Sequence, residues 1–501
     1  MKHYHPSFEE FVALAEQGNT IPVYRELLAD ALTPVLVYER LAAPADGAQA
    51  ANAFLLESVV GGERIARFSF IAANPEATFT ARRNEITLRQ GQTERTLTSS
   101  DPLGELAGML AGHHPVHLPD LPRFTGGVVG YAAYDMVRYY EDFGPGPEDD
   151  RGLPDMSFGL YRTMVVFDHV SKTVKVVANA TIQDDPASAY SQAQQAVEST
   201  ISRIRSGDSR SAAEITLVDL PQKPFTSNMT REQFMRTVEC CKEYIRAGDI
   251  FQVVPSQRLM VETDARPFDI YRALRVVNPS PFMFLLNAPE VTLVGASPEI
   301  LCRVEDGIVT NRPLAGTRRR GKTPEEDRQL EAELLADPKE RAEHIMLVDL
   351  ARNDVGIVAE PKTIELSDVM TVERYSHVMH IVSDVKGKLA EGKTAFDALR
   401  AALPVGTVSG APKIRAMEII DEFEPTRRGP YAGAVGYVDF SGNMDTCIAL
   451  RTLVIAADKA YIQVGAGIVA DSVPQTEYQE TLSKARALLR AIEVAEAGLG
   501  E

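Results

Sequence analysis

The chain has 501 residues, of which 45% are hydrophobic, and a formal charge of −18 at pH 7. Because this length exceeds what one hydrophobic core usually serves, we expect two or three domains or one large interlocked body. The acidic balance argues against a nucleic-acid partner, because binding a phosphate backbone depends on Lys and Arg side chains spread over a sizeable surface.

Cysteine usage and the N-terminus indicate the cellular compartment. The four cysteines, two of them adjacent at Cys240 and Cys241, fit neither a disulfide framework nor Cys-x-x-Cys spacing. The N-terminal stretch MKHYHPSFEEFVALAEQG has no basic segment followed by an apolar core, and no run of 18 apolar residues occurs in the chain. We therefore expect a soluble, cytoplasmic protein with free thiols and no membrane partner.

The first 200 residues alternate short strand patterns with turn signals, which is typical of an antiparallel sheet with flanking helices. A helix is predicted over 187–206, and strand patterns are predicted at 37–41, 53–62, 67–75, 77–91 and 163–182. Ser, Pro and Asp then dominate, and no hydrophobic period persists. We place a linker there, at 206–228, between an N-terminal region, 1–205, and a second domain, 229–495.

The second half again mixes strands with helices. Strands are predicted at 250–262, 282–316, 431–442, 445–458 and 459–472, and helices at 231–249, 340–350 and 476–498. Residues 387–394, GKLAEGKT, match a phosphate-binding pattern, but Glu391 would place a negative charge in the loop and Leu389 is bulky. We interpret that match as a surface turn.

Two predicted helices each carry a pair of glutamates three residues apart. The pairs are Glu340 with Glu343 and Glu477 with Glu480. Residues at i and i+3 share a helix face, so the like charges repel unless a positive group lies nearby. Four carboxylates around one point would suit Mg²⁺, which takes oxygen ligands and keeps several waters. The spacing alone equally allows two unrelated solvated faces.

Several longer motifs follow one another along the chain: LLES, NPSPFMF, SPEI, PLAGTRRRG, ERAEHIMLVDLARNDVG, LPVGTVSGAPKIRAMEII and QVGAGIVADSVPQTEYQET. With these motifs the chain resembles the chorismate-utilising enzymes, and most of all their anthranilate-forming members. The likeness spans most of the chain and is strongest from about residue 225 to 490. It implies an α+β fold in which two antiparallel β-sheets form a sandwich flanked by helices, with both halves of the chain intertwined.

The resemblance also implies a cofactor and a set of site residues. Mg²⁺ would be held directly by Glu343 and Glu480, with Glu340 and Glu477 in the outer shell, and would bridge to the ring carboxylate of chorismate. The implied catalytic residues are Gln252, Glu299, His380 and Thr407. The implied substrate-binding residues are Gly316, Thr317, Tyr431, Arg451, Gly465, Ala466 and Gly467.

Three of these implied roles have a physical basis. Glu299 would protonate the departing C4 hydroxyl, and burial raises the pKa of a carboxyl toward that use. Arg451, which we interpret as lying inside an apolar strand, needs an anion, either the enolpyruvyl carboxylate held together with Tyr431 or an internal Asp or Glu. The backbone N–H groups of 465–467 would face a carboxylate. Without the resemblance, 465–467 would be a tight strand end, His380 a core histidine and the threonines turn residues.

Two positions favour direct amination. Gln252 stands where water-activating relatives carry a lysine, and Ala315 stands where others carry a nucleophilic lysine. The implied reaction adds ammonia at C2 of chorismate, expels the C4 hydroxyl and eliminates pyruvate to give anthranilate, the first step of tryptophan biosynthesis. The alternatives are an aminodeoxychorismate synthase or a phenazine-pathway aminodeoxyisochorismate synthase and, from another class, a non-catalytic tryptophan-sensing protein.

The resemblance implies a partner and an inhibitor as well. The sequence contains no cysteine placed like a glutaminase nucleophile, so ammonia would come from a separate glutamine amidotransferase subunit, in a complex of two large and two small subunits. Tryptophan would inhibit at two segments that, considered alone, would be a buried strand end and a core strand. The implied tryptophan-binding residues are Glu57, Ser58, Pro281, Phe282 and Met283.

Overall fold

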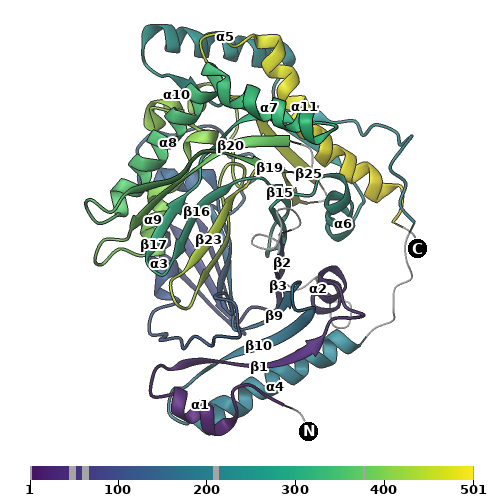
Figure 1. The fold of residues 1–501 in the computed structure, drawn as a ribbon, viewed down its shortest axis with the longest axis vertical. Coiled ribbons are helices and arrows are strands. Elements are labelled where there is room, and N and C mark those ends of the chain that lie inside the picture. Colours follow the sequence, from purple (N-terminus) through teal and green to yellow (C-terminus); the bar gives the residue numbers. More distant parts are fainter. Residues whose placement is uncertain are drawn as a thin grey trace.

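The computed structural model describes residues 3–43, 52–58, 67–206, 214–375, 378–457 and 459–499. Helices surround two large sheets whose strand pairs are antiparallel, as Figure 1 shows. One sheet has eleven strands, in the order β1-β10-β9-β3-β2-β14-β15-β24-β25-β13-β11. The other has twelve, in the order β18-β20-β17-β16-β23-β22-β7-β8-β4-β5-β6, with β19 also paired to β20. The predicted α+β fold is confirmed.

The helices of the described residues lie mainly on the outer faces of the two sheets (Figure 1). Their bounds are α1 Phe8–Leu14, α2 Pro34–Ala42, α3 Pro102–Gly108, α4 Pro186–Arg205, α5 Arg231–Ala247, α6 Pro267–Val277, α7 Pro324–Ala336, α8 Pro338–Val358, α9 Ala395–Ala402, α10 Lys413–Phe423 and α11 Pro474–Glu496, with short 3-10 turns η1 Tyr134–Tyr139 and η2 Gly406–Val408.

The strands before the predicted linker are β1 Thr20–Leu28, β2 Ala53–Glu57, β3 Phe68–Ala73, β4 Ala77–Arg82, β5 Glu85–Gln90, β6 Thr93–Thr98, β7 Gly127–Ala132, β8 Met156–Tyr161, β9 Thr163–Asp168 and β10 Thr173–Thr181. Those after it are β11 Thr226–Ser227, β12 Gln252–Val253, β13 Ser256–Glu262, β14 Phe282–Asn287, β15 Thr292–Ser297, β16 Ile300–Glu305, β17 Ile308–Asn311, β18 Leu314–Arg319, β19 Glu365–Arg374, β20 Val378–Lys388, β21 Gly410–Ala411, β22 Ala434–Asp439, β23 Met444–Ile448, β24 Thr452–Ala456 and β25 Lys459–Gly465.

The sandwich follows from the alternation of apolar side chains along the strands. In β14, Phe284 and Leu286 belong to the core between the two sheets. Met283 and Leu285, on the opposite face, pack instead in the core under α6 and α11. Because successive side chains of a strand point to opposite faces, a strand buried on both sides must be apolar throughout. β14 satisfies this requirement, so it lies in the interior of its sheet.

Both sheets combine strands from the two halves of the chain. β2 pairs with β3 on one side and with β14 on the other. In the second sheet β7 pairs with β22. In Figure 1 β2 and β3, from the first half of the chain, therefore lie in the same sheet as β15 and β25, from the second half. The predicted boundary at 206–228 stays a prediction about folding units, because strands from both sides of it are hydrogen-bonded in the same sheets.

One predicted strand is wrong. Residues 37–41 belong to α2, whose first turn is capped by the Thr33 hydroxyl accepting from the Leu36 N–H. Val37, Tyr38 and Leu41 are buried on one side of that helix, and their spacing of i, i+1 and i+4 fits a helical face. The apolar run was too short for its sequence pattern to distinguish a helix from a strand. The strand in this part of the chain is β1, which precedes α2.

Two predicted continuous strands are interrupted. The pattern at 250–262 divides into β12 and β13 around Pro255, which has no N–H to donate to a ladder. The pattern at 445–458 divides into β23 and β24, which belong to different sheets. The chain crosses between the sheets at 449–451, and this crossing places a side chain in the site described below.

Other predictions concern single features. The four cysteines are free, and Cys241, Cys302 and Cys447 are buried. In the part of the chain that the structure describes, no helix combines the length and the apolar composition needed to cross a membrane. The pattern at 387–394 begins in the last residues of β20 and ends at Thr394, which caps α9.

Candidate active site

A cavity of about 370 Å³ lies where the ends of several strands meet α8 and α11. Residues distant in the sequence line it together. Among the predicted site residues, those in its wall are Gln252, Glu299, Gly316, Thr317, Glu343, Thr407, Tyr431, Arg451, Gly465, Gly467, Glu477 and Glu480. The fold thus places most of the predicted catalytic, substrate-binding and metal-binding residues around one cavity.

Three predicted residues lie just behind this wall. His380 on β20 contacts the backbone of β18, with Nδ1 2.9 Å from the Gly316 carbonyl oxygen and 3.2 Å from the Thr317 hydroxyl. Burial lowers the pKa of His380, which keeps the ring neutral at pH 7. Glu340 accepts a hydrogen bond from Arg318 at 2.8 Å, and Ala466 is fully buried.

The predicted glutamate pairs lie on the two long helices. α8 begins after Asp337, whose carboxylate accepts from the N–H groups of the first turn. From α8 Glu343 reaches the cavity, and from α11 Glu480 and Glu477 reach the same cavity. Burial raises the pKa of Glu343, and the negative charge of Glu340 adds to the rise. Burial and then Glu480 raise the pKa of Glu477.

These carboxylates fit a hard cation held by few protein ligands. Within the described ranges, no three side chains of His, Cys, Asp or Glu form a group that could hold a metal ion by themselves. Mg²⁺, however, commonly takes one or two carboxylates and completes its shell with water and substrate oxygens. Glu343 and Glu480 supply two oxygen donors to one cavity, and the repulsion among the acids favours a cation there.

Glu299 follows β15 and precedes β16, with 6% of its surface exposed. Burial raises its pKa to about 8, although the Thr407 hydroxyl and the backbone N–H of Leu314 oppose part of that rise. The carboxyl therefore keeps its proton at neutral pH. A protonated acid in a cavity wall can donate that proton to a leaving group.

Arg451 is not inside a strand, as the sequence suggested, but at the crossing between β23 and β24. Its backbone is left-handed, with φ of 47°. This turn aims the side chain into the cavity wall rather than into a sheet. Burial lowers the pKa of Arg451, and no carboxylate of the described residues lies close enough to offset that loss of hydration. A half-buried guanidinium without a protein anion is suited to bind an anionic ligand.

Glycines let the backbone approach the cavity closely. A Cβ on Gly465 would come within 2.9 Å of the Tyr431 hydroxyl oxygen, and one on Gly467 within 2.6 Å of Gln252 Nε2. Gly316 has φ of 64°, which disfavours other residues. The Ala466 N–H donates to the Pro255 carbonyl at 3.2 Å. Of the three predicted backbone donors, the one of Ala466 is therefore engaged within the protein.

Some cavity residues were missed by sequence reasoning. Lys484 on α11 forms an ion pair with Glu480 at 2.8 Å and donates to the Gly465 carbonyl at 2.8 Å. Its position four residues after Glu480 on a helix was the available signal. Lys339 and Gln463 also line the cavity. Gln463 could have been noticed as a polar residue in the apolar pattern AYIQVG.

The predicted tryptophan-binding residues lie on neighbouring strands of one sheet. Glu57 at the end of β2 is paired with Met283 of β14. The buried Glu57 carboxylate accepts a hydrogen bond from the Tyr271 hydroxyl at 2.6 Å and pairs with Arg275 at 2.9 Å. The structure therefore brings Glu57 and Ser58 beside 281–283, while 59–62 of the same sequence pattern lie outside the described residues.

The wall of this cavity combines an arginine with several carboxyl groups, and this combination is typical of an enzyme active site. Residues 51–490 match the family described as chorismate binding enzyme, and the chain belongs to this family.

Individual relatives within this family are more informative than the family match alone. Anthranilate synthase component 1 of Acetivibrio thermocellus is 47% identical, over 98% of this chain and 99% of that protein. The crystal structure of anthranilate synthase component I from Streptococcus pneumoniae TIGR4 superposes with a TM-score of 0.74 at 38% identity, covering 92% of this chain and 99% of that one. The menaquinone-specific isochorismate synthase of Escherichia coli has the same fold, with a TM-score of 0.68 at 20% identity, over 97% of this chain and 98% of that one.

Proposed function

We propose that this chain converts chorismate and ammonia into anthranilate and pyruvate, as a lyase in tryptophan biosynthesis. The observation that carries the proposal is the composition of one cavity wall. Arg451 offers a cation that has no carboxylate partner among the described residues, Glu299 offers a proton, and Glu343 and Glu480 offer oxygen ligands for a cation. Relatives at 44–47% identity are anthranilate synthase components, which supports the same reaction.

The chain's own residues account for the proposed first step. Arg451, with Tyr431 beside it in the wall, binds a carboxylate of chorismate. Glu299 gives its proton to the C4 hydroxyl, which departs as water while the ammonia nitrogen forms its bond at C2. Gln252, in the same wall, has no basic group, and ammonia needs none because its lone pair is already nucleophilic. The ring then loses the proton at C2, the bond from C3 to the ether oxygen breaks, and the enolpyruvyl group gains a proton at its methylene carbon and leaves as pyruvate, which gives the aromatic product.

Mg²⁺ would be held by Glu343 and Glu480, with Glu340 and Glu477 behind them. When bound it would supply positive charge to the ring carboxylate of the substrate. Arg318, which pairs with Glu340 at 2.8 Å, offsets part of the negative charge of that outer carboxylate. Lys484, paired with Glu480, balances the negative charge of the site before a cation enters.

The proposal includes a partner and an inhibitor. The name component 1 of the relatives supports a second component, and a glutamine amidotransferase subunit would supply ammonia in a cytoplasmic complex of two large and two small subunits. Tryptophan would bind by Glu57, Ser58 and 281–283. In support, Phe282 of β14 is paired with Ser297 at the end of β15, two residues before Glu299. A ligand that shifts β14 could thereby alter the position of the acid.

A turnover assay tests the proposed function. The purified chain is incubated with chorismate, MgCl₂ and an ammonium salt at pH 8, and anthranilate fluorescence and pyruvate are measured together. We expect equal amounts of the two products. An amino-chorismate that retains its side chain would instead identify one of the other amino-transferring enzymes. No product from well-folded protein would contradict an enzymatic role and favour a tryptophan-sensing protein.

A further inference from the structure

Gln463 presents a buried amide oxygen that the fold leaves without a partner. The residue lies on β25, is 5% exposed and lines the active-site cavity. Its Nε2 donates to the Ser256 hydroxyl at 2.8 Å. Its Oε1 is buried and has no hydrogen-bond partner within the described part of the chain. An unsatisfied buried acceptor costs free energy unless a ligand supplies a donor.

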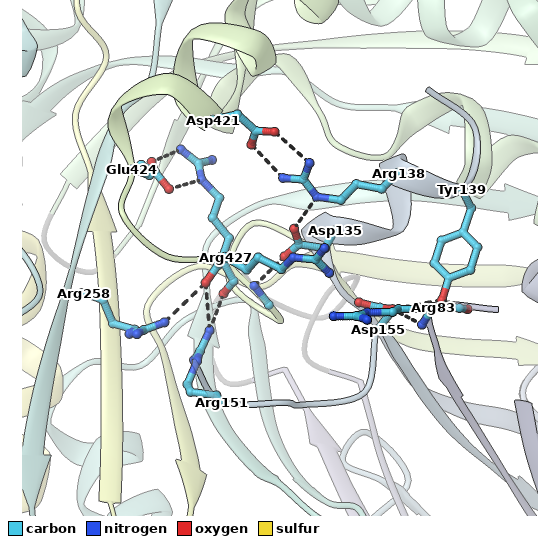
Figure 2. Close-up of polar contacts among 12 residues, drawn as sticks. Arg83, Asp135, Arg138, Tyr139, Arg151, Asp155, Arg258, Asp421, Glu424 and Arg427 are labelled. Atoms are coloured by element: carbon cyan, nitrogen blue, oxygen red, sulfur yellow. Dashed lines mark hydrogen bonds and ion pairs between the residues drawn. The ribbon is translucent and has the colours of Figure 1, made fainter. Parts of the chain in front are cut away.

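A chain of buried hydrogen bonds continues from Ser256. The Ser256 hydroxyl donates to Glu424 Oε1 at 2.8 Å, and the Ser256 backbone N–H donates to the same oxygen at 2.7 Å. Arg428 donates to both oxygens of that carboxylate, from Nη2 at 2.6 Å and from Nε at 2.9 Å. Figure 2 shows the Glu424 carboxylate joined by two dashed lines to a guanidinium group. Each of the three residues is at most 4% exposed.

These hydrogen bonds decide which end of the Gln463 amide is left without a partner. An ionised carboxylate only accepts hydrogen bonds, so the single hydroxyl proton of Ser256 must point to Glu424. The Ser256 oxygen can then only accept from Gln463. A flipped amide would bring two acceptors face to face, so Nε2 is held at Ser256 and Oε1 is left as the free acceptor.

The same series of hydrogen bonds is anchored to the cavity wall. Arg428 donates to the Val408 carbonyl at 2.7 Å and to the Val254 carbonyl at 2.6 Å. Val254 and Val408 both line the cavity. The guanidinium carbon of Arg428 also lies 5.5 Å from the centre of the Tyr431 ring, another wall residue. One buried guanidinium therefore fixes three parts of the wall and, through Glu424 and Ser256, the amide of Gln463.

We propose that Gln463 binds a reactant, its Oε1 accepting a hydrogen bond from an N–H or O–H donor, and that Ser256, Glu424 and Arg428 are positioning residues for it. The inference rests on the proposed function, which supplies two such donors: ammonia and the hydroxyl of chorismate. A neutral amide oxygen orients an N–H group without protonating the nitrogen, so it leaves the lone pair of ammonia free for attack.

Steady-state kinetics of Gln463→Met test the proposal. The variant keeps the volume of the side chain and removes the acceptor, and we expect the KM of one reactant to rise about tenfold, since a lost hydrogen bond is worth about one factor of ten. A higher KM for ammonia identifies ammonia as the donor, and a higher KM for chorismate identifies the hydroxyl. Should Gln463→Met fail to fold, Gln463→Leu replaces it. Unchanged KM values for both reactants would overturn the proposal.

Gln257→Met is the matched control. Gln257 lies on β13, the neighbour of β25, and is fully buried. Both ends of its amide are engaged, with Thr481 at 2.7 Å and Ser227 at 2.8 Å. This variant should lower the Tm and leave both KM values unchanged. A rise in KM equal to that of Gln463→Met would show a general effect of packing and contradict the proposal.

The positioning role requires its own readout. Ser256→Ala removes the group that holds Nε2, so the same KM should rise, by less than in Gln463→Met. In the double variant Ser256→Ala should add nothing, because Ser256 acts through Gln463. Additive effects would contradict the positioning role. If the wild-type chain makes no anthranilate, the proposed function fails, whereas turnover with unchanged KM values in Gln463→Met refutes this inference alone.

Discussion

Glu299 carries its proton at the pH of the cell because it is buried. Below its pKa of about 8 the carboxyl is neutral and can act as an acid, and above that value it is ionised. The same shift affects stability. The folded state retains a proton that the unfolded state releases near the ordinary pKa of glutamate, so the free energy of unfolding falls as the pH rises toward 8.

The first prediction concerns this group. We expect kcat/KM for chorismate, measured at constant free ammonia, to be level below pH 8 and to fall above it. Glu299→Gln should lower kcat by about 10²–10⁴-fold, the usual contribution of a general acid, and should abolish the decline above pH 8. A pH–rate profile of both proteins checks this. An unchanged alkaline decline in the variant would show that another group titrates there.

The second prediction concerns Arg451, for which the described part of the chain offers no carboxylate partner. Replacing it removes the cost of a half-buried charge and also removes the proposed substrate contact. In Arg451→Met we therefore expect the free energy of unfolding to rise, while chorismate binding loses about 2 kcal/mol or more, which is about 30-fold in KM. Denaturant unfolding and steady-state kinetics measure the two effects.

Arg138→Met is the control for Arg451. Arg138 pairs with Asp135 at 2.9 Å and with Asp421 at 2.7 Å, as Figure 2 shows. Its loss leaves a buried Asp135 without its cation, so this variant should be destabilised. If Arg451→Met were destabilised to the same extent, Arg451 would be a structural residue rather than one reserved for a ligand.

At the scale of the elements, α8 and α11 bring acids from distant parts of the chain to one cavity. The third prediction is that MgCl₂ stabilises the chain by about 3 kcal/mol at 100 times its Kd, observed as a rise in Tm. Glu343→Gln and Glu480→Gln should lose this response. Without magnesium the same variants should be at least as stable as the wild type, because repulsion among the acids is reduced.

Asp349→Asn serves as the control for the two helices. Asp349 lies on α8 but is 65% exposed, beside Arg352. This variant should keep the full response to MgCl₂. A wild-type chain whose Tm does not change with MgCl₂ would contradict the proposed cation site, whatever its activity.

Sequence patterns predicted the long helices well and the crossings between sheets poorly. The i, i+3 glutamates of α8 and α11 were readable because helical spacing is local. The break before Arg451 could not be predicted, because the apolar residues on both sides of it fit one continuous strand. Only the structure shows that β23 and β24 belong to different sheets. Gln463 was missed because its importance lies in Ser256, Glu424 and Arg428, which are distant in sequence and adjacent only in the fold.

At the scale of the whole molecule, the two halves share their sheets. The fourth prediction is that residues 1–205 and 229–501, produced separately, do not fold cooperatively. Separation would remove β14 from β2 and β22 from β7, exposing long strand edges. Circular dichroism melts and size-exclusion chromatography check this. A monomeric 1–205 fragment with a cooperative melt would instead establish 206–228 as a true domain boundary.

The central claim is that carboxylates from two separate helices face one cation beside a bound aromatic carboxylate. The most direct test is a crystal structure grown with MnCl₂ and anthranilate, in which anomalous scattering locates the metal. We expect the metal peak between Glu343 and Glu480, with anthranilate in the same cavity near Arg451. A metal peak elsewhere, or the two glutamates turned away from a common ligand, would contradict the account.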